Sequence, residues 1–127
     1  MAGPIEVIDA WARASGKALE TTAYVTVLNH GTEPDWLIRV DSSRAEYADL
    51  RRTVWKGLVA KVQIEQRVPI PPMARTVLAP GKVEIYLRAL TQPVHEQDAL
   101  PLTLTFEHAG QVDVAASVTR HYLGAPE

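Results

Sequence analysis

Few residue types in this sequence are suited to chemistry, and those present form no familiar catalytic motif. Cysteine is absent, which removes thiolate nucleophiles, disulfides, zinc fingers and iron–sulfur ligation. The histidines fall in predicted turns or in the tail, at His30, His95, His108 and His121. We find no Gly-rich phosphate loop, no G-x-S-x-G elbow and no H-E-x-x-H. We therefore do not expect an enzyme. A histidine metal site stays open, because turns can converge at one end of a folded domain.

One strand presents a pair of polar side chains that we expect to lie near the functional site of this protein. Pro80-Gly81 predicts a turn, and the residues after it alternate between apolar and polar as in a half-buried strand. Val83, Ile85 and Leu87 would face the core. Glu84 and Tyr86 would then stand side by side on the other face, about 6.5–7 Å apart.

The composition bounds the class of protein. The chain has 127 residues and a formal net charge of −2, which predicts a single domain (1–127) and gives no basic field for nucleic acid. An anionic membrane surface is equally unsupported by these totals. There is no apolar run long enough to span a bilayer, and the N-terminus has no signal-peptide pattern. No small-molecule substrate is indicated.

Short apolar–polar alternations bounded by turn residues recur along the whole chain. They predict strands at 5–13, 22–29, 36–40, 44–52, 58–64, 82–87, 100–106 and 112–119, with an extended edge segment at 68–72 and a short one at 75–78. Residues 44–52 would also suit a helix, since Ser42 or Ser43 could cap it. The spacing predicts an all-β Greek-key sandwich or barrel of eight or nine strands, with a loose tail at 120–127.

The region 53–57 is predicted to be a loop that carries Trp55 and Lys56. A tryptophan in an exposed loop would be a recognition residue. We expect Trp55 instead to fold back onto the core, because aromatic side chains are usually buried.

The order of these segments is similar to a known family. The segments that carry the resemblance are Asp9-Ala-Trp-Ala-Arg13, Thr22-Ala-Tyr-Val-Thr-Val-Leu-Asn29, Asp35-Trp-Leu37, Ala45, Val68-Pro-Ile-Pro71, Leu78-Ala-Pro-Gly81, Leu87-x-x-Leu90 and Leu102-Thr-Leu-Thr-Phe106. Over about 5–118 the chain resembles the PCu(A)C copper chaperone family. The resemblance implies a cupredoxin-like β-sandwich and a periplasmic or extracellular location. It also implies a role in carrying Cu(I) toward the copper centre of cytochrome c oxidase.

In that family copper is held by a histidine, a methionine about ten residues later, and a His-x-Met after Pro-Gly. The resemblance puts Arg51, Lys61, Glu84 and Tyr86 at these positions, with the intervening loop a residue short. Cations repel a metal ion, and oxygen ligands do not select Cu(I). We therefore expect no cofactor at this position. An Arg51–Glu84–Lys61 ion-pair network beside Tyr86 and plain solvated charges are both open there.

Three functions remain open at this level. The first is a binding or scaffold module without copper, related to copper delivery or oxidase assembly and with room for a protein partner. The second is a copper carrier with other ligands, drawn from Met73, His95, His30 or His108. The third is an enzyme or carbohydrate-type binding sandwich whose site uses Trp55, Trp36 and Tyr86 as stacking surfaces.

Overall fold

The fold is built entirely from strands in the part of the chain that the structure describes, residues 3–120 of a computed structural model. The strands are β1 (Ile5–Arg13), β2 (Glu20–Asn29), β3 (Asp35–Asp41), β4 (Ala45–Lys56), β5 (Val59–Ile64), β6 (Val68–Ile70), β7 (Ala74–Leu78), β8 (Val83–Leu90), β9 (Ala99–Phe106) and β10 (Gly110–Thr119). Within these residues there is no helix of the length and apolarity needed to cross a bilayer.

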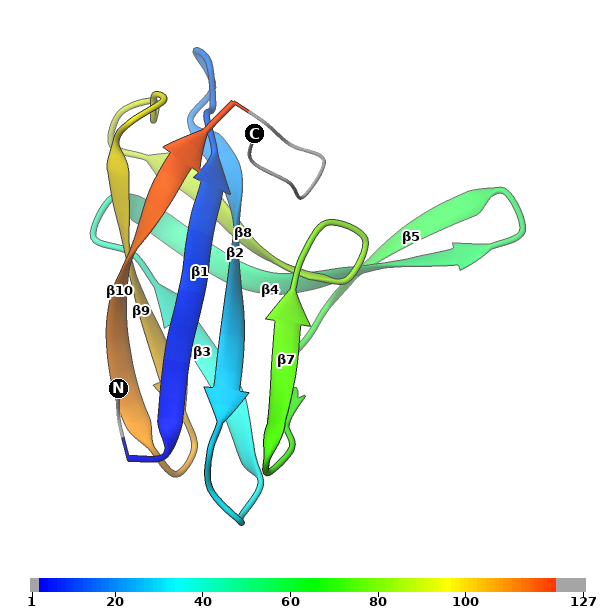
Figure 1. The fold of residues 1–127 in the computed structure, drawn as a ribbon. Helices are drawn as coiled ribbons and strands as arrows, with labels where there is room; N and C mark the ends of the chain where they lie inside the picture. Colours follow the sequence, from blue (N-terminus) through cyan, green and yellow to red (C-terminus); the bar gives the residue numbers. More distant parts are fainter. Residues whose placement is uncertain (1–2, 121–127) are drawn as a thin grey trace.

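The strands form one hydrogen-bonded sheet that curls into a sandwich (Figure 1). Its order is β5-β4-β8-β2-β1-β10-β9-β3-β6, and β7 pairs with the second half of β2. The sheet closes on itself because β3 contacts β4 and β6 contacts β7. β1 and β10 run parallel, whereas the other neighbours are antiparallel. The strands at the two ends of this order are β5 and β6.

Alternation along β8 and β9 explains much of the core. In β8 the side chains of Val83, Ile85 and Leu87 point inward and are buried. The same period of two in β9 buries Leu102 and Leu104. These residues belong to one hydrophobic cluster that draws on both sides of the sandwich.

Most of the strand pattern predicted from the sequence is confirmed, with two differences. The described residues contain ten strands rather than eight or nine, because the short segments at 68–70 and 74–78 both pair within the sheet. Residues 45–56 form one continuous strand, so neither the helix nor a loop at 53–57 is present. The tail beyond residue 120, with His121, lies outside the described residues.

The hairpin of residues 51–64, which we call the arm, is paired with β8 only at its base, through Arg51 and Arg52, and beyond them it leaves the sandwich as a two-stranded ribbon (Figure 1). Every residue of β5 is exposed. Trp55 is 65% exposed on this ribbon, so the prediction that it folds back onto the core is wrong. The reason is geometric, because nothing in the described chain packs over a ribbon that projects beyond the body.

Candidate functional site

The strand after Pro80-Gly81 lies between β4 and β2, and its outer face is the candidate site. Antiparallel pairing sets Arg51 opposite Glu84 and Asp49 opposite Tyr86. On the other side, Thr22 of β2 is opposite Tyr86. The turn depends on Gly81, whose φ of 84° lies in the left-handed region that glycine adopts without strain. Glu84 and Tyr86 therefore share the outer face, as the alternation predicts.

Glu84 is engaged by a buried tyrosine. The hydroxyl of Tyr24 donates to Oε2 of Glu84 at 2.5 Å and lies 3.0 Å from Oγ1 of Thr22. The Tyr24 ring is fully buried and packs against Trp11, with centroids 4.6 Å apart. Burial, followed by the hydrogen bond to Glu84, raises the pKa of Tyr24 to about 12, while the bond to Thr22 lowers it.

Arg51 covers the ring of Tyr86. Its guanidinium carbon lies 4.0 Å from the ring centroid, which is cation–π geometry. Burial raises the pKa of Tyr86 above its ordinary value, and a hydrogen bond to Glu20 acts in the same direction. The charge of Arg51 opposes this shift. The aromatic face and the phenol of Tyr86 are thus both occupied by neighbours from the chain itself.

Lys61 does not join this group. In the arm Lys61 is opposite Val54, whereas Arg51 is opposite Ile64, so Lys61 lies three residues farther along the ribbon. Alternation also turns it to the other face from Val62. Of the two arrangements left open for these charges, the Arg51–Glu84–Lys61 ion-pair network is not seen, because none of the three residues has an ion pair within residues 3–120.

A shallow pocket of about 270 Å³ lies where the arm leaves the body. Its lining comes from β4, β5 and β8: Asp49, Arg51, Val62, Ile64, Tyr86 and Arg88. The residues of β5 that line the pocket with Arg51 and Tyr86 are thus Val62 and Ile64, and Lys61 is not among them. This mixture of a cation, a phenol and aliphatic side chains has no soft metal donor.

Two of the residues considered as alternative copper ligands, Met73 and His95, lie far apart. His95 lies in the loop after β8. Its neighbour Val94 is hydrogen-bonded to Ser15, just beyond the end of β1, so the loop lies at that end of the sandwich. Met73 donates its backbone N–H to Gly31, beyond the far end of β2. Met73 and His95 therefore lie at opposite ends of the sandwich and cannot bind one ion. Across residues 3–120 no group of three or more histidine and carboxylate side chains could hold a metal ion.

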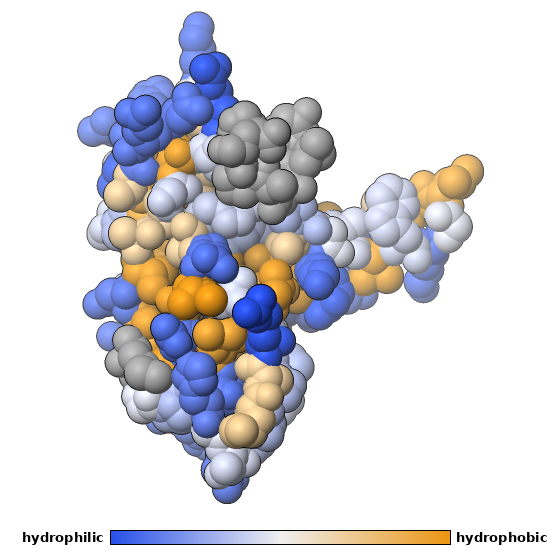
Figure 2. All heavy atoms as spheres, in the orientation of Figure 1, coloured by the Kyte–Doolittle hydropathy of each residue, from blue (hydrophilic) through white to orange (hydrophobic). Residues whose placement is uncertain are grey.

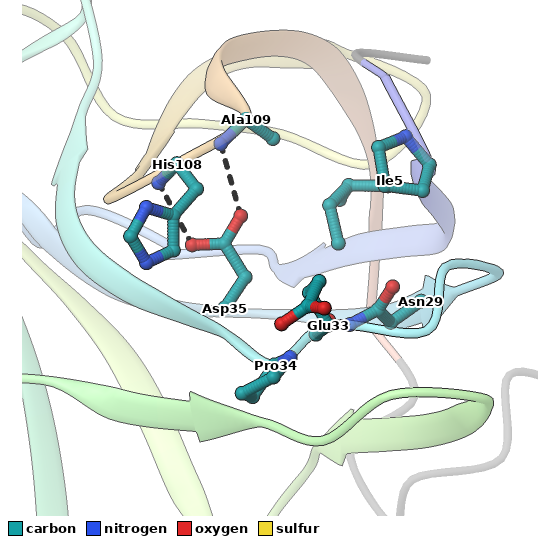
Figure 3. A pocket seen from close by; sticks show the side chains of 8 residues that line it. Ile5, Asn29, Glu33, Pro34, Asp35, His108 and Ala109 are labelled. Atoms are coloured by element: carbon teal, nitrogen blue, oxygen red, sulfur yellow. Dashed lines mark hydrogen bonds between the residues drawn. The ribbon is translucent and has the colours of Figure 1, made fainter.

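A larger pocket of about 370 Å³ lies at the end of the sandwich that carries His108 (Figure 3). The carboxylate of Asp35 lines this pocket, but its oxygens already accept hydrogen bonds from the backbone. Its oxygens accept from the backbone N–H groups of His108 and Ala109, both at 2.9 Å. Asp35 also accepts from Trp36 N–H at 2.7 Å. This acid ties the β9–β10 turn to β3, which is a structural role.

The three aromatic residues considered for stacking do not form a platform. Trp36 is covered by Arg67, whose guanidinium carbon is 4.1 Å from the ring centroid. Tyr86 is covered by Arg51 in the same way. Only Trp55 is freely exposed, and it lies out on the arm.

Comparison with known proteins identifies the family. The LpqE-like family, described as "Putative lipoprotein LpqE-like", matches residues 5–118. The chain belongs to this family. A relative from Leifsonia xyli subsp. xyli (strain CTCB07), named "Putative lipoprotein Lxx21020", is 30% identical over 124 residues, which are 97% of this chain and 74% of the relative.

Solved structures agree on the architecture of this LpqE-like chain. The apo PCuAC domain from PmoF1 superposes with a TM-score of 0.80 at 24% identity, covering 95% of this chain and 98% of that domain. The copper-bound PCuAC domain from PmoF2 superposes with a TM-score of 0.75 at 28% identity, covering 93% and 94%. The cupredoxin-like PCuAC fold expected from the sequence is confirmed.

Two residues of the site went unnoticed in the sequence. Tyr24 lies in a strand where its neighbours Ala23 and Val25 are also buried, so alternation alone does not reveal its role. Val62 could have been found by pairing β4 with β5 around Gly57, which places Thr53 and Val62 opposite each other. The register of that hairpin decides which of the adjacent residues Lys61 and Val62 faces the site.

Proposed function

We propose that this LpqE-like chain is a PCuAC-like domain that does not hold Cu(I) at the family position and acts as a binding or scaffold module rather than a catalyst. The observation that carries the proposal is the pairing of Arg51 with Tyr86 and of Glu84 with Tyr24 at this position. Each group that could reach a metal already has a partner of its own.

The donor set also fits copper poorly. Cu(I) is a soft ion that prefers thioether and imidazole ligands. Arg51 remains charged at any physiological pH and would repel it. Tyr86 would have to lose a proton that its surroundings hold more tightly than usual. Nothing in this set supports a soft-metal centre, whereas the copper-bound relative shares the fold at 28% identity.

Titration with Cu(I) under reducing conditions, in competition with a chromophoric chelator, tests this proposal. We expect no tight equivalent for the natural chain. One tight equivalent that is lost in Met73→Leu or His95→Ala would overturn it in favour of other ligands.

Restoring soft donors supplies the positive control. The substitutions Arg51→His, Glu84→His and Tyr86→Met would be combined with either Val62→Met or Lys61→Met. Because Val62 lines the pocket and Lys61 does not, we expect tight Cu(I) binding only in the set with Val62→Met. Equal Cu(I) binding by both sets would show that the position of the methionine on β5, at residue 61 or 62, does not decide whether it can reach the ion.

We further propose an extracytoplasmic location for this chain. The support is the lipoprotein description of the family and of the Leifsonia relative. Fractionation of the producing cell with an antibody to the chain tests the location, and a purely cytosolic signal would contradict it. A protein partner in copper delivery or oxidase assembly is part of the proposal, and it would be sought by crosslinking in intact cells.

A further inference from the structure

The free end of the arm is apolar and solvent-exposed. Leu58 at the turn is 97% exposed, and Trp55 and Val59 beside it are 65% and 67% exposed. Figure 2 shows hydrophobic side chains gathered at the tip of the projection, away from the body. Monomeric proteins seldom expose several large apolar side chains together unless that surface binds something.

The arm is also the most basic part of a chain that is acidic overall. Residues 51–64 contain four cations, Arg51, Arg52, Lys56 and Lys61, and no aspartate or glutamate, while the chain carries a formal charge of −2. Arg52 is paired with Glu65 at 2.6 Å. The two lysines have no ion pair within residues 3–120 and lie on either side of the apolar tip. An apolar end flanked by free cations is complementary to a surface that is apolar inside and negative outside.

We propose that the tip of the arm inserts into the surface of an anionic lipid bilayer. Trp55 lies two residues from Gly57, so the apolar tip is about 6–7 Å deep. This matches the 5–10 Å to which amphipathic segments enter the headgroup boundary. Trp55 would lie at the interface that tryptophan prefers, and the long side chains of Lys56 and Lys61 would reach back to the phosphates.

The shape of the arm favours a bilayer over a protein or a second copy. A ribbon two strands wide, approached end-on, offers far less than the roughly 800 Å² per partner of a stable protein interface. Side-by-side pairing of two β5 edges would bring together strands that each carry an exposed lysine, a feature that disfavours edge pairing. This inference is independent of copper, so its failure would leave the Cu(I) titration unaffected.

Co-sedimentation of the full chain with lipid vesicles tests the proposal. Vesicles of phosphatidylcholine with phosphatidylglycerol should bind the protein, and brominated lipid should quench its tryptophan fluorescence. Leu58→Asp should weaken binding about tenfold or more, since it replaces an inserted apolar side chain with a charge. Met73→Asp is the matched control, because Met73 is 73% exposed outside the arm, and it should bind as the natural chain does.

The role of the cations has its own readout. Lys56→Glu with Lys61→Glu should abolish binding to anionic vesicles, and raised salt should weaken binding of the natural chain. Absence of vesicle binding, or equal loss in Leu58→Asp and Met73→Asp, would overturn the proposal. A Leu58-dependent dimer seen by analytical ultracentrifugation without vesicle binding would assign the tip to a second copy instead.

Discussion

The carboxylate of Glu84 accepts a hydrogen bond from Tyr24 and has no ion pair with a cation in the described part of the chain, although Arg51 lies directly opposite it on β4. Arg51 instead turns onto the ring of Tyr86. A hydrogen bond from a buried phenol to a carboxylate is charge-assisted and little exposed to solvent ions. This distinction gives Glu84 a different response to salt than an ion-pair network would.

We expect Glu84→Gln to lower the free energy of unfolding by about 1–2 kcal/mol, because the charge-assisted bond from Tyr24 becomes a neutral one. Urea unfolding at low and high salt measures the effect, and salt should leave the difference unchanged. Asp49→Asn, which removes an exposed contact with Arg88, should cost about 0–1 kcal/mol. A Glu84→Gln effect that disappears in high salt would restore the ion-pair explanation.

Tyr24 also predicts a response to alkaline pH. Its pKa of about 12 in the folded chain is above the unfolded value of 10.0, so the folded state holds the proton more tightly. The stability that this provides is complete below pH 10 and is lost as pH rises from 10 to 12. Tyr24→Phe should therefore flatten the fall in unfolding free energy over this range.

Urea unfolding at pH 8 and pH 11 measures that fall. The raised pKa of Tyr86 leaves some pH dependence even in Tyr24→Phe. Tyr47→Phe, at an exposed position of β4, is the control and should retain the full fall. If the unfolding free energy fell equally in Tyr24→Phe and Tyr47→Phe, loss of the Tyr24 proton would not be the cause of the fall.

At the scale of elements, the arm and the body depend on different interactions. The first part of β4 buries Leu50 against the core, whereas its end and all of β5 contribute no buried side chain. Beyond Arg52, which is the last residue of β4 paired with β8, the arm is held by the pairing of β4 with β5 out to Lys56 and Val59. It can therefore change without disturbing the core.

We expect replacement of residues 55–60 by Asn-Gly to leave the melting temperature nearly unchanged. Val54 and Lys61 are directly paired, so a two-residue hairpin turn can join them. Leu50→Ala, in the same strand but in the core, should cost about 2–5 kcal/mol. Calorimetry compares the two, and a large destabilisation by the shortened arm would show that the arm supports the body.

At the scale of the whole molecule, charge and apolar surface are distributed unevenly. The body closes by contacts of β3 with β4 and of β6 with β7, and Asp35 fastens the turn between β9 and β10. The arm carries four cations, no aspartate or glutamate, and several exposed apolar side chains, while the chain as a whole is slightly acidic. A total charge near zero therefore concealed a local surface suited to an anionic partner.

Local alternation was enough to predict the strands, the core face of β8 and the outward pair of Glu84 and Tyr86, because a strand reverses its side chains at every residue. Turn residues such as Pro80-Gly81 marked where the strands begin. The sequence by itself thus determined an all-β sandwich.

Only the tertiary structure decided which side chains meet. Tyr24 and Glu84 are 60 residues apart and come together through the pairing of β2 with β8. The register of the β4–β5 hairpin separated Val62 from Lys61, and the projection of that hairpin left Trp55 in solvent. Contacts across strands depend on register and on where the sheet ends, and neither is encoded in the period of a single strand.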